Sequence, residues 1–133
     1  MSSKTVAEKL LIKPGTAVWS SPADDLERVG PLPDKVGRAQ GPAEAATALL
    51  FVDDEASLRK VLAAHGEDLH GPDVVWILYP KGGVSDINRD SIPPHLSEHR
   101  MRPIGQVGVD ETWSALRFRP LEPGEAPFKG RQT

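Results

Sequence analysis

The stretch DVVWILYPKGGVSDINRD, residues 73–90, decides the fold class of this chain. It begins with an uninterrupted apolar block, Val74–Tyr79, and passes through Pro80 into a charged segment that contains adjacent glycines. A strand that is apolar at every position has both faces buried, and such strands occur mainly in parallel sheets covered by helices. We therefore predict a central strand of a parallel sheet here, with its polar continuation at the edge of the sheet.

The segment before this strand contains a second strand pattern and the clearest helix pattern. ATALLFVDD, residues 46–54, is another apolar block, and it ends in a pair of acids. In EASLRKVLAAHG, residues 55–66, apolar side chains recur at helical spacing. Asp54 is placed to cap the first turn, and Gly66 is placed to provide a left-handed stop. We predict a buried strand followed by a helix.

Strand and helix patterns alternate along the rest of the chain. The other expected elements are a short helix within 5–15, a strand at 16–20, a short helix after Ser21, a weak strand at 35–39, a helical segment from Ser85 or Asp86 that Pro93-Pro94 interrupts, and closing strands at 102–110 and 114–120. Such alternation predicts a small three-layer α/β sandwich with right-handed crossovers. Its sheet should be mostly parallel, with an antiparallel C-terminal strand.

The pattern fits a single domain over residues 5–120. A chain of 133 residues buries roughly two-thirds of its unfolded surface on folding, which suffices for one hydrophobic core. The segment 121–133 has too little apolar content to pack, so we expect a flexible C-terminal tail there.

Charge and composition exclude several classes of function. The formal net charge of −3 gives no general attraction to nucleic acid or anionic lipid, so we expect neither as a partner. The chain has no cysteine, which excludes disulfides, thiolate metal sites and cysteine nucleophiles. No run approaches the ~20 apolar residues of a membrane span, and we expect a cytoplasmic protein.

Several motifs resemble a family of small bacterial single-domain proteins of unknown function. The resemblance covers Leu11–Arg119 and includes KPGTAVW, ALLFVDD, DVVWILYPKG with DINRD, and VDETWSALRF. Its most specific pieces are W-x3-P-K at 76–81, D-x2-R-D at 86–90 and DETWSALRF at 110–118. This resemblance implies no activity, cofactor or partner.

The element order also resembles the Rossmann-like methyltransferases, shortened by one unit. That likeness implies a small Rossmann-like sandwich, but the cofactor motifs of those enzymes are missing. They need a glycine-rich turn after the first strand and an acid at the end of the second, which binds the ribose. Here VWSSPADDLE follows the first strand without a glycine, and KVGRAQ offers no acid. We therefore expect no cofactor.

Ligands in open α/β sheets bind outside the carboxyl ends of the strands. Four loops should converge there, containing Ser20-Ser21, Asp53-Asp54, Lys81–Asp90 and Asp110–Trp113. The candidate ligand-binding residues are Lys81, Gly82, Gly83, Asp86, Arg89, Asp110 and Trp113. The lysine, the glycine backbone and the positive end of a helix starting near Asp86 could together hold a small anion.

The same residues also have a purely structural interpretation. The glycines would form a turn, Asp86 would cap the following helix, and Arg89 would pair with Asp86 or Asp90. Trp113 would then pack at the edge of the core. HLSEH at 95–99 matches the H-x-x-E-H pattern of zinc peptidases, but the adjacent prolines leave only a short helix, so we expect a solvated face and no metal.

Three functions remain open. We favour a non-catalytic α/β module that binds a protein partner or a small anionic ligand at the carboxyl edge of the sheet. The second is a small enzyme with Lys81 and Arg89 as charge stabilisers and Asp86 or Asp110 as acid–base. It requires Lys81, Arg89, Asp110 and Trp113 around one pocket. The third is a degenerate methyltransferase-like fold that retains nucleoside binding. A weak strand and an exposed sheet edge would also permit a homodimer.

Overall fold

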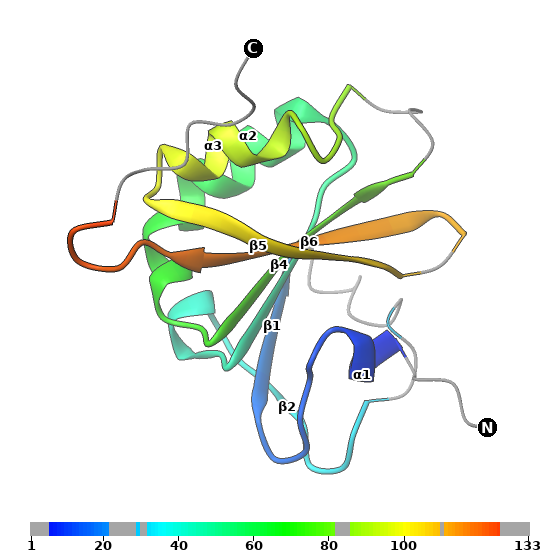
Figure 1. Ribbon diagram of the computed structural model, residues 1–133. Coiled ribbons are helices and arrows are strands. Elements are labelled where there is room, and N and C mark those ends of the chain that lie inside the picture. The colour runs from blue at the N-terminus through cyan, green and yellow to red at the C-terminus, as the bar shows by residue number, and fades with distance from the viewer. Residues whose placement is uncertain (1–5, 22–28, 30–31, 82–85, 110, 126–133) are drawn as a thin grey trace.

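A single sheet with helices on both faces forms the body of the molecule (Figure 1). The computed structural model describes residues 6–21, 29, 32–81, 86–109 and 111–125. Its strands are β1 (Ala17–Ser21), β2 (Gly37–Arg38), β3 (Thr47–Phe51), β4 (Val74–Pro80), β5 (Met101–Gly108) and β6 (Trp113–Pro120). Its helices are α1 (Val6–Lys9), α2 (Glu55–His65) and α3 (Ile92–Ser97), with 3-10 turns η2 (Pro42–Glu44) and η3 (Gly66–His70).

The six strands lie in the order β2-β1-β3-β4-β6-β5. Strands β1 to β4 are paired in parallel, whereas β6 runs antiparallel to both β4 and β5. The predicted fold class, a Rossmann-like sandwich with a mostly parallel sheet and an antiparallel C-terminal strand, is therefore confirmed. The weak strand predicted at 35–39 is present as the two residues of β2.

Strand β4 is the central strand that its apolar run predicts. Residues Val74–Tyr79 are all buried, and their side chains alternate between the two faces of the sheet. Ile77 faces α2 and α3, whereas Trp76 faces α1 and donates its indole N–H to the carbonyl of Leu10 at 2.8 Å. Burying side chains of this size contributes roughly 1.5–3 kcal/mol each. That burial makes β4 the anchor of both helical layers.

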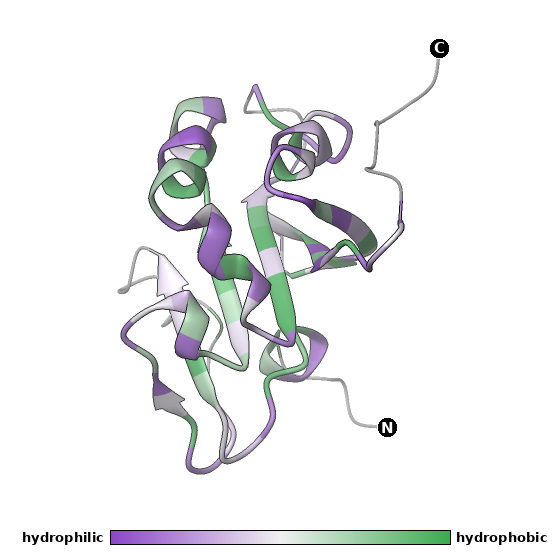
Figure 2. Ribbon diagram, turned by 90° about the vertical axis from the view of Figure 1, so that its left-hand side faces the viewer, coloured by the Kyte–Doolittle hydropathy of each residue, from purple (hydrophilic) through white to green (hydrophobic). Residues whose placement is uncertain are grey.

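Each face of the sheet has its own core. Helices α2 and α3 cover one face, and α1 covers the other (Figure 1). The first core contains Leu50, Ile77 and Phe118 packed under Leu58 and Leu96. In Figure 2 the central strands are mostly green, whereas the outer turns of the helices are purple. This is expected for a buried sheet between amphipathic layers. None of the described helices combines the length and apolar character needed to cross a bilayer.

The N-terminus of α2 is capped by carboxylates from separate segments. The Asp54 side chain accepts a hydrogen bond from Ser57 N at 2.8 Å, as predicted, and this bond holds the pKa of Asp54 below its ordinary value. The Asp86 side chain accepts from Glu55 N at 2.8 Å. The prediction that Asp86 caps its own helix was wrong, because α3 begins only at Ile92 and Asp86 lies beside α2.

The end of α2 differs from the predicted left-handed stop. Gly66 has φ −52°, which is right-handed, and the chain continues directly into η3. A Cβ at Gly66 would overlap the ring of His99. The glycine is needed here for close packing rather than for its conformational freedom.

Pro93 and Pro94 lie in the first turn of α3, where a missing N–H removes no helical bond. Ahead of them Asn88 forms a tight turn, in which its side-chain oxygen accepts from Asp90 N at 2.8 Å and Ser91 N at 3.0 Å. The helix predicted after Ser21 falls on residues that lie outside the described ranges. Ser85, one of the two predicted starts of the helical segment before Pro93, also lies outside them.

The start of the segment predicted as a flexible tail is held by charged groups. Glu125 binds Arg119 through both carboxylate oxygens, at 2.8 and 2.9 Å, and also binds Arg102 on β5. These hydrogen bonds, chiefly that from Arg119, lower the pKa of Glu125 to about 2. Residues 121–125 are thereby attached to the β5–β6 pair, and the remainder of the segment lies outside the described residues.

Candidate functional site

The strand order creates a topological switch point between β1 and β3. From β1 the chain crosses to β2 on one side, and it then crosses back to β3 on the other side of β1. Connections leave these neighbouring strands in opposite directions, which opens a crevice at their carboxyl ends where α/β proteins bind ligands. A hollow of about 340 Å³ lies at this position. It is lined by Ser21, Phe51, Asp53, Ser57, Lys60, Val61, Ala64 and His65, and we call it the switch-point hollow.

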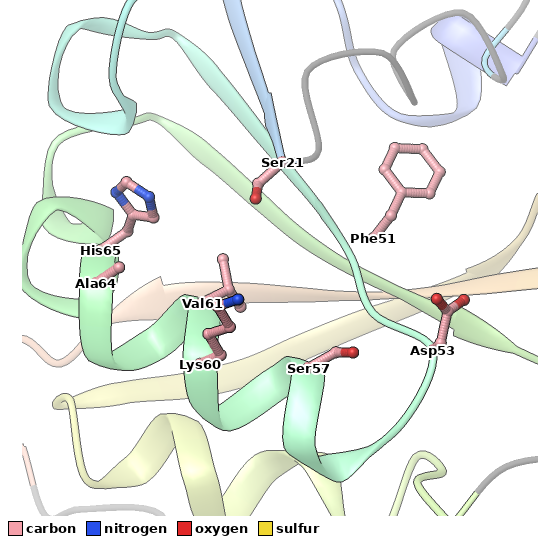
Figure 3. A pocket seen from close by; sticks show the side chains of 8 residues that line it. All are labelled: Ser21, Phe51, Asp53, Ser57, Lys60, Val61, Ala64 and His65. Atoms are coloured by element: carbon pink, nitrogen blue, oxygen red, sulfur yellow. The ribbon is translucent and has the colours of Figure 1, made fainter.

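Helix α2 supplies one wall of the switch-point hollow (Figure 3). Ser57, Val61 and His65 are spaced by four residues and therefore share a face of the helix. The His65 ring meets Trp19 edge to face, with centroids 4.7 Å apart, which fixes the ring at one end of the hollow. Ser57 lies at the opposite end, beside the capped N-terminus of the helix.

The ends of β1 and β3 supply the facing wall. Figure 3 shows the Ser21 hydroxyl directed toward α2, and Asp53 at the same end of the hollow as Ser57. The Phe51 ring points away from α2, and it meets Trp113 edge to face with centroids 5.5 Å apart. Phe51 therefore closes the hollow through its strand, while its ring belongs to the core on the α1 face.

The chemistry of the switch-point hollow is mixed. It offers hydroxyls from Ser21 and Ser57, a carboxylate from Asp53, an ammonium from Lys60 and an imidazole from His65. The hydroxyl groups can donate hydrogen bonds to a polyhydroxylated ligand and accept them from it, and the carboxylate can accept them. Val61 and Ala64 give the hollow an apolar floor. Over the described ranges, no group of three or more metal-binding side chains is assembled here or elsewhere.

A second hollow lies at the end of β4, on the part of the edge that the sequence singled out. It has a volume of about 390 Å³ and is lined by Tyr79, Pro80, Lys81, Ile87, Asn88, Arg89, Gln106 and Ser114. We call it the Lys81–Arg89 hollow. Strand β4, the turn before α3 and the β5–β6 pair all contribute to it, so its walls come from segments far apart in sequence.

The structure brings together only some of the predicted site residues. Lys81 and Arg89 line one hollow, as expected for an anion site. Asp86 lies at the N-terminus of α2 instead. Trp113 is 7% exposed and packs in the core on the α1 face. It therefore lines neither the switch-point hollow nor the Lys81–Arg89 hollow. Gly82, Gly83 and Asp110 lie outside the described residues.

The expected ion pairs of Arg89 are not formed. Among the residues that the structure describes, neither Arg89 nor Lys81 takes part in a salt bridge. The local spacing favoured a pair with Asp86 or Asp90. The Asn88 turn and the bond from Asp86 to Glu55 N fix the backbone on both sides of this position.

The two histidines of the HLSEH segment contact different neighbours. His95 Nε2 lies 3.3 Å from Glu55 Oε1, and the His99 ring packs against Gly66. Helix α3 ends at Ser97, so the two histidines do not share a helical face. The geometry agrees with a structural role for this segment.

Residues of α2 were missed as site candidates. Ser57 and Lys60 occupy polar positions of a periodic helix and His65 lies at its C-terminus, and nothing in this local pattern distinguishes a binding face from a solvated one. Ser21 and Asp53 were placed correctly at the carboxyl edge, but their meeting depends on the order of the strands. The signal that could have found them is the pairing of β1 with both β2 and β3.

No protein-family model and no curated protein sequence matches this chain. Solved structures do match. A tRNA methyltransferase of Bacillus subtilis, TrmK, superposes with a TM-score of 0.53 at 14% identity, covering 95% of this chain and 71% of that one. A protein of the NADB-Rossmann superfamily from Streptococcus agalactiae gives a TM-score of 0.51 at 10% identity, covering 90% and 69%. At such identities the likeness shows a shared Rossmann-like fold.

Proposed function

We propose that this chain is a non-catalytic Rossmann-like module that binds a nucleoside, or the nucleoside part of a larger molecule, in the switch-point hollow. The observation that carries the proposal is the position of the hollow between β1 and β3. Proteins with open α/β sheets bind nucleotide cofactors at this point of the fold.

The lining residues suit a ribose. The Asp53 carboxylate can accept hydrogen bonds from vicinal hydroxyls, and Ser21 or Ser57 can donate to or accept from the same ring. The apolar side of α2, at Val61 and Ala64, provides a surface for a base. A volume of about 340 Å³ is at the small end of ligand pockets, which favours a nucleoside over a dinucleotide.

The departures from the methyltransferase pattern support binding rather than methyl transfer. Strand β1 ends at Ser21, and the sequence that follows it, PADDLER at 22–28, has no glycine that would let a backbone approach a cofactor tail. Strand β2 ends at the exposed Arg38, where those enzymes have the ribose acid. Asp53, beyond β3, is the carboxylate that would take over that role. The tRNA methyltransferase likeness therefore supports the ligand class and not the reaction.

Calorimetric titration of the full chain with adenosine and with S-adenosylmethionine tests the proposal. Saturable binding of adenosine is expected, with Asp53→Asn weakening it about tenfold because a charged acceptor becomes a neutral amide. Asp68→Asn, an exposed acid on η3, is the matched control and should leave the affinity unchanged. Absence of binding by both ligands would refute the proposal. Equal binding by Asp53→Asn would place the ligand elsewhere.

A further inference from the structure

The Lys81–Arg89 hollow collects donors from four segments of the chain. Lys81 follows β4, Asn88 and Arg89 belong to the turn before α3, Gln106 lies on β5 and Ser114 on β6. Among the described residues that line it, none carries a carboxylate. Its two formal positive charges attract an anion, since neither has a carboxylate partner in the described part of the chain.

The inner wall of this hollow is a chain of hydrogen-bonding side chains. Gln106 Nε2 donates to the Tyr79 hydroxyl at 3.0 Å and lies 3.4 Å from Ser114 Oγ. Tyr79 is 5% exposed, and its hydroxyl acts as acceptor toward Gln106. Its own proton therefore remains available for an acceptor in the hollow. The Gln106 bond fixes that hydroxyl in place before any ligand arrives.

The cations are positioned by their surroundings. The backbone N–H of Lys81 donates to Thr112 O at 2.8 Å, which ties the end of β4 to the start of β6. A Cβ at Gly108 would lie 3.3 Å from Lys81 Nζ, so the lysine side chain runs beside this glycine of β5. Arg89 follows Asn88, whose side-chain oxygen accepts from Asp90 N and Ser91 N in a closed turn.

We propose that the Lys81–Arg89 hollow binds the phosphate group of a phosphorylated small molecule. A phosphate monoester carries nearly two negative charges at neutral pH, which matches one lysine and one arginine. Its three terminal oxygens can accept from the ammonium, the guanidinium and the Tyr79 hydroxyl. A volume of about 390 Å³ exceeds that of phosphate alone and leaves room for the group that carries it. The site is separate from the switch-point hollow and does not depend on the function proposed there.

Titration of the ¹⁵N-labelled full chain with inorganic phosphate tests this site, with sodium chloride used to hold the ionic strength constant. Saturable changes are expected in the amide signals of Tyr79, Lys81 and Arg89. Lys81→Gln and Arg89→Gln should each weaken phosphate binding about tenfold, because each removes a charge-assisted hydrogen bond. Lys9→Gln removes the same charge from the exposed end of α1 and should change the affinity by less than about twofold.

Three results would overturn the proposal: no saturable change with phosphate, equal weakening by Lys9→Gln, or acetate binding as tightly as phosphate. The first denies a site, the second shows general charge screening, and the third assigns the hollow to carboxylates. Amide signal dispersion verifies that each variant is folded. If Lys81→Gln does not fold, the affinity of Arg89→Gln for phosphate alone tests the proposal. Adenosine, added separately, reports on signals of α2, so failure of one site is distinguishable from failure of the other.

Discussion

The carboxylate of Asp86 accepts a hydrogen bond from the backbone N–H of Glu55, 31 positions earlier, at 2.8 Å. This bond joins the segment after β4 to the first turn of α2. Glu55 extends the junction, because its own carboxylate lies 3.1 Å from Arg59 and 3.3 Å from His95 of α3. The N-terminus of α2 is thus occupied by side chains of the protein itself.

Removal of this bond should destabilise the fold. Asp86→Ala leaves one N–H at the start of α2 without its carboxylate, and a lost N-cap interaction costs about 1 kcal/mol. Asp86→Asn keeps an acceptor oxygen and should cost less. Urea unfolding measures both free energies. An Asp86→Ala variant as stable as the parent would show that water replaces the carboxylate without loss.

Gly66 and His99 should be energetically coupled. Gly66→Ala places a methyl group against the His99 ring, and overpacking of this kind costs roughly 1–3 kcal/mol. In a His99→Ala background the same change should be neutral or stabilising, because Gly66 has a right-handed φ of −52° and alanine favours that conformation. A double-mutant cycle by urea unfolding gives the coupling energy. Additive effects would mean that the ring moves aside freely.

Leu11 should be replaceable by glycine with a gain in stability. It has φ 63° at the end of α1, where Ile12 N donates to Ala7 O at 3.0 Å and Leu11 N to Glu8 O at 3.1 Å. A left-handed conformation costs a residue with a Cβ roughly 1–2 kcal/mol, and Leu11 is 38% exposed, so little burial is lost.

Leu11→Gly should raise the free energy of unfolding by about 0.5–1 kcal/mol, net of the glycine entropy in the unfolded chain. Leu11→Ala is the matched control, since it loses the same side chain while keeping the Cβ, and it should show no gain. Thermal unfolding of the two variants side by side separates relief of backbone strain from loss of the leucine side chain.

Acid should release the segment held by Glu125. The pKa of this carboxyl is lowered from 4.5 to about 2 by Arg119 above all, so the unfolded chain takes up a proton at higher pH than the folded one. The stabilisation it provides is fully present above about pH 5 and is lost as the pH falls toward 2.

Glu125→Gln should lack this contribution. Its urea midpoint should lie below that of the parent at pH 7, and the difference should shrink between pH 4.5 and pH 2.5 and also at high salt. Arg59→Gln, which breaks the exposed pair with Glu55, is a control for surface charge in general. A difference that persists unchanged at pH 2.5 would contradict an ionic origin.

Local patterns were sufficient for the fold. The apolar run of β4 and the capped, periodic α2 are encoded by neighbouring residues, and each is where its pattern predicts. The partner of Asp86 was not predictable in this way, because its carboxylate accepts from the backbone N–H of Glu55, which is distant in the sequence. The fate of Trp113 was open for a similar reason, since its contact with Phe51 depends on how β3 and β6 are placed around β4.

The sequence placed its candidate residues at the carboxyl edge of the sheet, and among the described ones the structure brings Lys81 and Arg89 together there. Lys81 and Arg89 could be found because they follow the most obvious strand. Ser57 and Lys60 could not, since a polar helix face gives the same pattern whether it meets solvent or a crevice. Only the strand order, with β1 between β2 and β3, distinguishes the two cases.

The position of β6 also constrains how the chain can fold during synthesis. Among the described strands this one comes last in the chain, yet it lies between β4 and β5 and is the strand with which β5 pairs. Until Pro120 has left the ribosome, β5 has no neighbour and one edge of β4 is bare, which exposes a strongly apolar strand to other nascent chains. Ribosome-associated chaperones would therefore bind the exposed edge of β4 in the interval between synthesis of Pro80 and emergence of Pro120.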